Sequence, residues 1–466
     1  MITKENNLRW MFVVLPALAM MLGWGLRGHI GGGPFGAMIP GAMVALSICL
    51  LLKLPASVTS IVVVFGVFGI GLGGEMTYGQ TLGFLRNPET VWWGTAGTTI
   101  KGAVWGFLGG VVFSMSFLFH RIPKKIIVNG LLLMLGGFFL GFKLVNEPML
   151  LYFSDPANPR AESWAALLLG AIVLLVFLRF KVKSTDFRLV RRFAFYGLAG
   201  GGLGFGIGGL WMVLGSHLPG VIFGDWWKAM EFTFGLLLGA SLGWAAWKSR
   251  KEIQTIIETD KIPPMPSLSA VNELAILFAV ALFTFWLWPN LVEPFAGARS
   301  SADSFALSMM RGIARVLVNY GFYGFLFVLV LIRFPKVAWQ IGITLTFCHA
   351  VIDLSRDFYP DLNPWDPFTI HFFQVLIMTA LVALLTIYLS RRENSVMNLF
   401  LLLIWSCILV SLLRLVFLSG SLSVSGMSFC EVVCHRFFVD IFFIANAIAV
   451  SWIIFNMKKN QKLISE

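Results

Sequence analysis

Long apolar runs, each of about 18 to 22 residues, recur from one end of the chain to the other. A helix of about 20 apolar residues is needed to cross the roughly 30 Å hydrocarbon layer of a bilayer. Helices are the expected spanning unit, because backbone polar groups in lipid must be paired within the segment. Hydrophobic residues make up 58% of the chain and charged residues 12%, which excludes an ordinary soluble domain. The sequence therefore predicts an all-α polytopic membrane protein.

The hydropathy pattern divides the chain into about fourteen predicted transmembrane helices. Glycine and phenylalanine are abundant, as expected where small residues let helices approach and large apolar residues face lipid. The predicted spans are 10–26, 35–52, 58–74, 99–119, 126–144, 163–180, 193–214, 229–247, 269–288, 316–332, 338–354, 368–389, 397–418 and 437–456.

Lysine and arginine residues gather in alternate loops of this map, for example at Lys53, Lys124, Lys183, Lys251 and Lys336. Loops of this kind stay on the cytoplasmic side of a membrane. One missed or added span would invert the pattern downstream, and the pattern does not invert. We therefore predict that both termini are cytoplasmic (N-in/C-in). The net charge of +12 then reflects topology and does not indicate nucleic-acid binding.

The first apolar run follows Lys4 and Arg9 and shares features with a signal peptide. We expect it to be retained, because its glycine-rich end recurs later in the chain. The five cysteines are too few and too scattered for a disulfide framework. The predicted location is the cell membrane, crossed many times, which in a bacterium is the inner membrane.

A charged stretch with three prolines, KSRKEIQTIIETDKIPPMPS, separates two groups of apolar runs. Its composition is typical of a linker. We predict a glycine-rich eight-helix bundle over residues 1–247, a cytoplasmic linker over 248–268 and a six-helix bundle over 269–466.

Glycine-rich hairpins recur within the first eight predicted helices. One carries LGWGLRGHIGGGPFGAMIPGAM at 22–43, and the next carries IGLGGEMTYGQTLGF at 70–84. Each has a glycine-rich outward helix, a polar mouth, and a return helix that begins with glycine or aromatic residues, which predicts four related hairpins. The alternative explanation is composition alone, because glycine-rich transmembrane helices resemble one another.

Three charged residues, Arg27, Glu75 and Lys143, follow glycine clusters at the outer ends of the first, third and fifth predicted helices. An ionisable residue within a membrane span is costly and indicates a functional site by default. If the hairpins pack quasi-symmetrically, the three side chains converge on one outward-facing pocket for an anion or polyol. The predicted mouth residues are His29, Tyr78, Gln80, Asn146 and Glu147. The alternative is a structural Arg27–Glu75 ion pair, with Lys143 extending to the membrane surface.

A second candidate site lies in HAVIDLSRDFYP at 349–360. His349, Asp353, Arg356 and Asp357 share one face if the helix continues that far. Together with nearby Trp365, Asp366, His371 and Gln374, this face has the residue types that bind a sugar by stacking and hydrogen bonds. A solvated helix end is the alternative for Asp357 and Asp361. Arg414, His435, Arg436 and Asp440 are the residues expected to neutralise the carboxylates.

The sequence predicts no metal and no cofactor. Cys430, Cys434 and His435 lack a second cluster that would complete a four-ligand site, and their spacing departs from haem attachment. Walker A, HExxH and GxSxG motifs are absent. The glycine-rich strings lie in or beside membrane helices and do not follow a strand, so they are not phosphate loops.

We predict a secondary transporter or permease for a small polar solute, with an organic anion or sugar acid as the first candidates. The alternative is a membrane-embedded transferase or hydrolase that acts on an outer-leaflet, lipid-linked or glycan substrate. Expected partners are membrane lipids and the solute, and the chain works alone, as an oligomer or in a larger assembly. The predicted substrate-binding residues are Arg27, His29, Glu75, Tyr78, Gln80, Lys143, Asp353, Arg356, His371, His435 and Asp440.

Overall fold

The computed structural model describes residues 2–155, 162–218, 225–260, 268–297, 304–358, 366, 368–418 and 437–465. Their regular structure is helical, without a strand in these ranges. Thirteen helices of the described residues are long and apolar enough to cross a membrane, or fourteen if one bent pair counts as a single span. The all-α multi-pass class is therefore confirmed, while the number of spans and their orientation remain predictions.

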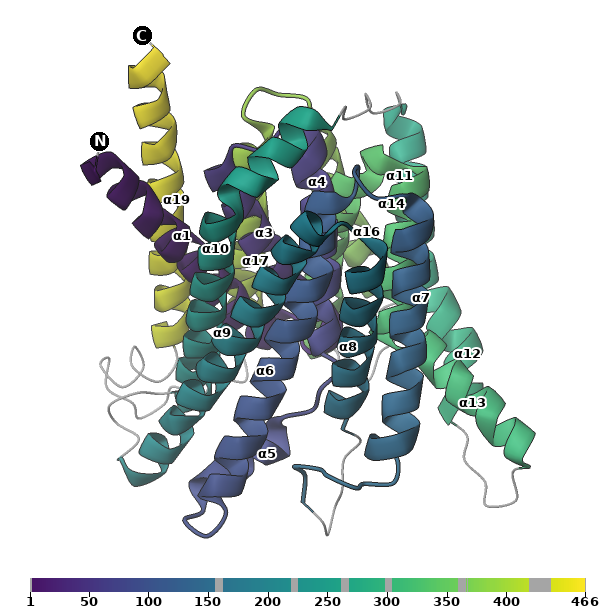
Figure 1. Ribbon diagram of the computed structural model, residues 1–466. Coiled ribbons are helices and arrows are strands. Elements are labelled where there is room, and N and C mark those ends of the chain that lie inside the picture. The colour runs from purple at the N-terminus through teal and green to yellow at the C-terminus, as the bar shows by residue number, and fades with distance from the viewer. Residues whose placement is uncertain are drawn as a thin grey trace.

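The helices of the first part are α1 (Ile2–Ile30), α2 (Gly33–Gly36), α3 (Met38–Leu52), α4 (Ala56–Gly73), α5 (Gly79–Gly83), α6 (Val91–Met115), α7 (Lys124–Gly141), α8 (Trp164–Lys181), α9 (Ser184–His217) and α10 (Trp226–Thr259). Those of the second part are α11 (Ala270–Leu282), α12 (Trp288–Gly297), α13 (Phe305–Val318), α14 (Tyr320–Arg333), α15 (Thr346–Phe358), α16 (Ile370–Ser390), α17 (Ser395–Leu418) and α19 (Phe438–Ser465). Both chain ends lie at the same end of the bundle, the top of Figure 1. We call this end the terminal face and the other end the opposite face.

Six helices of the first part form a closed ring. In order around it, α1 packs on α10, α10 on α9, α9 on α6, α6 on α4, α4 on α3, and α3 returns to α1. The pair α7 and α8 packs against this six-helix ring through α6. Helices α14, α17 and α19 of the second part pack on α4, α3 and α1. The two predicted domains thus share a broad contact surface, and the boundary between them remains a prediction.

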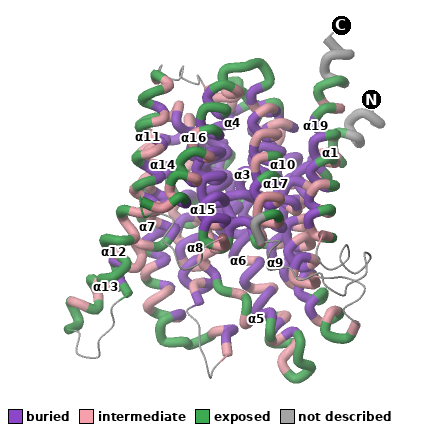
Figure 2. The backbone as a smooth tube through the Cα atoms, turned by 180° about the vertical axis from the view of Figure 1, so that it is seen from behind, coloured by how far each residue is buried: buried purple, intermediate pink, exposed green. Residues whose placement is uncertain are grey.

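Burial follows this arrangement. The purple, buried stretches of Figure 2 lie at the centre of the bundle, and green, exposed stretches mark its periphery. Helices α3 and α4 and the stretch that ends in α15 are almost wholly buried, whereas α16 and α19 expose much of their surface. Their exposed side chains are large and apolar, for example Ile370 and Trp452. Such residues are suited to contact with lipid tails.

Glycines allow the ring helices to touch backbone to backbone. A Cβ atom at Gly106 of α6 would lie 1.9 Å from the carbonyl oxygen of Gly197 in α9, and one at Gly102 would lie 2.3 Å from the carbonyl oxygen of Gly201. Small residues are the usual means of close helix approach in membranes. This packing accounts for the glycine-rich composition without a repeat, so the four related hairpins remain a prediction.

We expect Gly106→Ala to destabilise the protein by about 2 kcal/mol, because the new methyl group must push α6 and α9 apart. Gly136→Ala in α7 is the matched control, since nothing lies within 4 Å of a Cβ atom there. Thermal unfolding in detergent micelles measures the difference. Equal unfolding temperatures for the two variants would show that the α6–α9 contact does not limit stability.

Two boundaries differ from the sequence prediction. The predicted span 316–332 is not one straight helix, because α13 ends at Val318, α14 begins at Tyr320, and the two are bent by 57°. Helix α10 continues to Thr259, so the first half of the predicted linker is helical. Asn319 explains the bend, because its extended backbone ends one helix and begins the next.

In the part of the chain that the structure describes, complete π-helical turns lie at Phe142–Asn146, Phe283–Leu287 and Gln340–Leu345. A π-turn inserts an extra residue into an α-helix and is frequent at functional sites. The third of these turns leads directly into α15, which carries the predicted stripe of ionisable residues.

Candidate functional site

An aromatic cluster fills the interior of the six-helix ring. Trp24 of α1 lies 4.8 Å from Trp105 of α6 and 4.4 Å from Phe234 of α10, measured between ring centroids. Phe205 of α9 lies 4.7 Å from Phe234. All four side chains are less than 2% exposed. The interior of the ring is therefore filled where these side chains meet. We call these four residues the aromatic cluster.

Arg27 lies against this cluster, one turn beyond Trp24 on α1. Its guanidinium carbon is 5.7 Å from the centroid of Trp24 and 5.4 Å from that of Trp105, within the range of cation–π attraction. It donates hydrogen bonds to the hydroxyl of Tyr78 and to the carbonyl oxygen of Gly33. The α4–α5 connection and the α1–α2 turn thus hold one guanidinium between them.

The charge of Arg27 has no acidic partner among the described residues. Arg27 is 5% exposed, and no described carboxylate lies within 4 Å of it. Its Nε atom is buried and has no hydrogen-bond partner among those residues. Burying a charge without a partner is costly, so a position of this kind favours an anion.

Beside Arg27, helix α10 contributes a buried ion pair. The Nζ of Lys228 lies 2.6 Å from Glu231, and the two side chains are 7% and 1% exposed. The indole of Trp227 donates to Glu231 at 3.0 Å and stacks on Tyr78. The Tyr78 hydroxyl also hydrogen-bonds Glu231. One carboxylate therefore serves the two cations Lys228 and Arg27, and one positive charge is left without a counter-charge. The sequence analysis assigned neither residue to a site.

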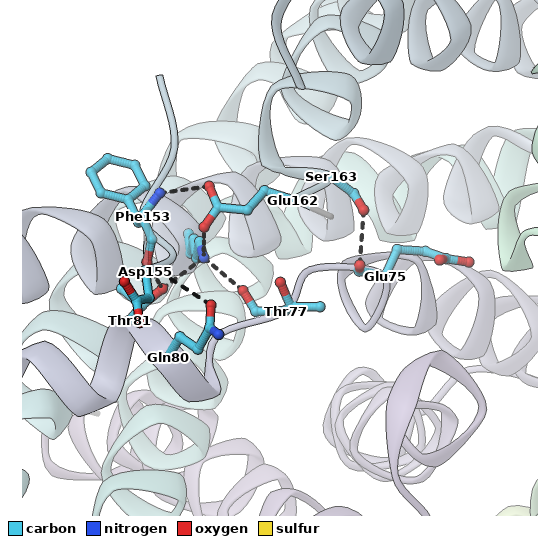
Figure 3. A network of polar contacts seen from close by, with 9 residues as sticks. Glu75, Thr77, Gln80, Thr81, Phe153, Asp155, Glu162 and Ser163 are labelled. Carbon is cyan, nitrogen blue, oxygen red and sulfur yellow. Dashed lines mark hydrogen bonds and ion pairs between the residues drawn. The ribbon is translucent and has the colours of Figure 1, made fainter. Parts of the chain in front are cut away.

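A second buried ion pair fixes the connection that carries Tyr78. The Nζ of Lys101 lies 2.9 Å from Glu162 and donates to the carbonyl oxygen of Thr77 at 2.6 Å and to the hydroxyl of Thr81 at 2.8 Å. Figure 3 shows Glu162 joined to the backbone of Phe153 in the same network. The network lies on both sides of Tyr78 in sequence, so it positions the hydroxyl that faces Arg27.

Glu75 lies between the two parts of the chain. Its carboxylate accepts the backbone N–H of Tyr320, the first residue of α14, and its carbonyl oxygen accepts the hydroxyl of Ser163. In Figure 3 its side chain is directed away from Glu162. Burial raises the pKa of the Glu75 carboxyl from 4.5 to about 7, although the hydrogen bond from Tyr320 acts in the opposite direction. Near neutral pH this group therefore exists in both protonation states.

A cavity of about 400 Å³ opens beside Glu75, between α7 and α8 on one side and α13 and α14 on the other. Its polar lining includes Glu75, Arg315 and Asn319, and its apolar lining includes Phe138 and Leu167. A cavity with both kinds of wall suits an amphipathic molecule.

The predicted stripe on the second part is confirmed as helical, since α15 continues to Phe358. Asp357 pairs with Arg414 of α17 at 2.9 Å, as expected for a neutralising arginine. Arg414 also donates to the carbonyl oxygen of His29, and His29 lies 3.6 Å from Asp440 of α19. Residues from the beginning and the end of the chain thus meet at the C-terminal end of α1, which points toward the opposite face.

The predicted residues fall into separate groups. Arg27 contacts Tyr78, whereas Glu75 and Lys143 have other partners, and neither forms an ion pair with Arg27. Lys143 pairs with Glu147 at 2.7 Å. The expected convergence of the three charges is therefore not seen as direct contact, and neither is the alternative Arg27–Glu75 ion pair.

The remaining predicted residues occupy varied positions. Gln80 accepts a hydrogen bond from the backbone of Asp155 at 3.3 Å, and His371 of α16 is buried. Asp353 and Arg356 lie on α15 close to each other. His435 lies outside the described residues, as do Arg436 and the cysteines Cys430 and Cys434.

Comparison of the chain with models of known protein families, with curated proteins and with solved structures finds no match.

Proposed function

We propose that this multi-pass membrane protein is a secondary transporter for a small organic anion, and that Arg27 binds the negative charge of the solute. The single observation that carries the proposal is the buried, uncompensated guanidinium at the centre of the six-helix ring. A carboxylate or phosphate would satisfy both its charge and its free N–H. An organic anion or sugar acid has the chemistry that this position favours.

The surroundings of Arg27 support a site that changes its access. The aromatic cluster separates Arg27 from the terminal face, which we propose to be cytoplasmic because the basic loops follow the positive-inside pattern. Arg27 hydrogen-bonds the short turn between α1 and α2, and interrupted helices of this kind line the substrate sites of many transporters. In the state described, Tyr78 occupies the position that the solute would take on the guanidinium.

The test is uptake by purified protein in liposomes. The panel contains radiolabelled gluconate, glucuronate, succinate and lactate, with glucose as the uncharged comparison. We expect saturable uptake of at least one anion, which excess unlabelled anion suppresses, and no uptake of glucose. Uptake equal to that of protein-free liposomes for every anion would refute the proposal.

A second candidate is a membrane-embedded transferase or hydrolase acting on a lipid-linked substrate. The cavity beside Glu75 favours it, because Arg315 and Asn319 can face a polar head group while Phe138 and Leu167 face an apolar chain. Mass spectrometry of lipids incubated with the protein distinguishes the two candidates. A covalently altered lipid without anion uptake would support the enzyme and exclude the transporter.

A further inference from the structure

The start of α14 is capped by a carboxylate from a distant part of the chain. The backbone N–H of Tyr320, the first residue of α14, donates to Glu75, which lies 245 positions away. Asn319 occupies the N-cap position, where an asparagine side chain commonly accepts such a bond, but its side chain makes no cap hydrogen bond. Glu75 and Asn319 both line the cavity of about 400 Å³ beside the bend.

The carboxylate of Glu75 has no cationic partner in the part of the chain that the structure describes. No Lys, Arg or His side chain there lies within 4 Å of it. Its neighbours in the cavity wall include Thr77 and Ser163, which are neutral. A negative charge in the wall of a partly apolar cavity is costly unless a positive charge joins it. This wall therefore favours a ligand with an ammonium group.

A positive charge lies in another wall of the same cavity. Arg315 of α13 lines it, and its Nε donates to the carbonyl oxygen of Ala296 at 2.9 Å. A guanidinium carries five N–H donors in a planar fork, which suits it to bind a phosphate group. Helix α13 has no acidic residue, and its other charged residue is Arg311. This wall therefore favours a ligand with a phosphate group.

The rest of the cavity wall is largely apolar. Leu72 comes from α4, Phe138 from α7, Leu167 from α8 and Val316 from α13. A water-soluble zwitterion does not need such a wall, whereas a hydrocarbon chain is stabilised by it. The ligand that fits all of the walls therefore carries an ammonium group, a phosphate group and a hydrocarbon chain.

Helix α13 is suited to the level of lipid head groups. In Figure 1, α12 and α13 lie at the edge of the bundle and are directed outward near the opposite face. Phe305 and Met310 of α13 are 83% and 59% exposed, and the same helix carries Arg311 and Arg315. Exposed apolar side chains together with arginines are typical of helices at a membrane–water interface. A lipid in the adjoining leaflet would thus meet the cavity with its head group.

From this geometry we propose that the cavity binds a zwitterionic phospholipid with a primary ammonium group, of the phosphatidylethanolamine class. The ammonium group pairs with Glu75, the phosphate binds Arg315, and part of an acyl chain lies against Phe138 and Leu167. The lipid is bound without a change in its covalent bonds. This inference does not depend on the transport of an anion at Arg27.

Other occupants and a purely structural role account for less of the arrangement. Phosphatidylglycerol offers a phosphate but leaves Glu75 without an opposite charge. Phosphatidylcholine has a quaternary ammonium group, which has no N–H to donate to the carboxylate. Capping of α14 requires only a hydrogen-bond acceptor, so a neutral glutamine at position 75 would serve it without placing a negative charge in the cavity.

The experiment is native mass spectrometry of the delipidated protein in detergent. It is titrated with phosphatidylethanolamine, phosphatidylcholine and phosphatidylglycerol of identical acyl chains, and with water-soluble glycerophosphoethanolamine. We expect phosphatidylethanolamine to bind about tenfold more tightly than the other two lipids, because it alone forms a charge-assisted hydrogen bond with Glu75. The soluble head group should bind more weakly than the lipid. Equal binding of the three lipids, or of the lipid and its soluble head group, would overturn the proposal.

Two variants separate the contributions of the two charges. Glu75→Gln keeps an acceptor for the N–H of Tyr320 and should lower the affinity for phosphatidylethanolamine about tenfold without lowering that for phosphatidylglycerol. Arg315→Gln should weaken the binding of both lipids, since both carry a phosphate. Glu89→Gln is the matched control, because Glu89 is an exposed carboxylate in the connection between α5 and α6 and does not line the cavity.

Thermal unfolding identifies a misfolded variant. If Glu75→Gln does not fold, Arg315→Gln and the lipid preference of the unmodified protein decide the question. Folded variants that bind all three lipids as the unmodified protein does would overturn the site. A preference for phosphatidylethanolamine in a protein that takes up no anion would support this site and refute the proposed function, whereas anion uptake without a lipid preference would refute this site alone.

Discussion

Arg27→Ala is expected to lower the affinity for the transported anion about 100-fold, because a charge-assisted hydrogen bond from a buried guanidinium contributes roughly 1.5–3 kcal/mol. The variant also removes the only charge in this region that lacks a counter-charge among the described residues. Concentration dependence of anion uptake into liposomes measures the effect. Arg27→Lys keeps the charge but loses the planar fork, so its affinity for the anion should lie between those of the unmodified protein and of Arg27→Ala.

Arg86→Ala is the control for this prediction. Arg86 is an exposed arginine in the connection between α5 and α6, and its removal should leave uptake unchanged. A general loss of positive charge would affect both variants alike. If Arg27→Ala folds and transports with unchanged affinity, Arg27 is a structural residue and the anion site lies elsewhere.

Glu162→Gln should destabilise the protein by about 3 to 5 kcal/mol, because it leaves the ammonium group of Lys101 buried without a counter-charge. The two side chains are 1% and 2% exposed, so water cannot replace the lost partner. Replacing both residues, as Lys101→Met with Glu162→Leu, should recover part of the loss, since no charge then remains buried. Thermal unfolding of the three variants in detergent gives the comparison.

The Lys143–Glu147 pair is a natural control, because it has the same residue types at 2.7 Å but is 21% and 34% exposed. Glu147→Gln should change stability by less than about 1 kcal/mol. If Glu162→Gln costs no more than Glu147→Gln, the buried network around Thr77 and Thr81 does not depend on its ion pair.

The class of fold follows from the sequence because each apolar run must form its own helix in lipid. The break at Asn319 does not follow in the same way. The residues on both sides of it are apolar, so hydropathy continues across a point where the backbone bends. Which helices form the ring is likewise set by glycine contacts between distant segments, such as Gly106 with Gly197, and a single sequence does not indicate such pairs.

The sequence also indicated some residues of the candidate site but not the pairs that they form. Arg27 and Tyr78 are conspicuous in the sequence because a polar residue beside a glycine-rich membrane helix is unusual. The partner of Lys101 is 61 positions away, and only the structure brings it to Glu162. Lys228 and Glu231 are three residues apart on one helix, a spacing that could have indicated an ion pair.

The glycine contacts of the six-helix ring have a mechanical consequence. Where two helices touch through their backbones, no side chains lie between them that could change rotamer and let the helices slide. The contacts of Gly102 and Gly106 with α9 therefore make this part of the protein stiff. In the transporter that we propose, the motion that opens the solute site would then come from parts of the protein other than the α6–α9 pair, such as the bend between α13 and α14, with this pair as the fixed frame.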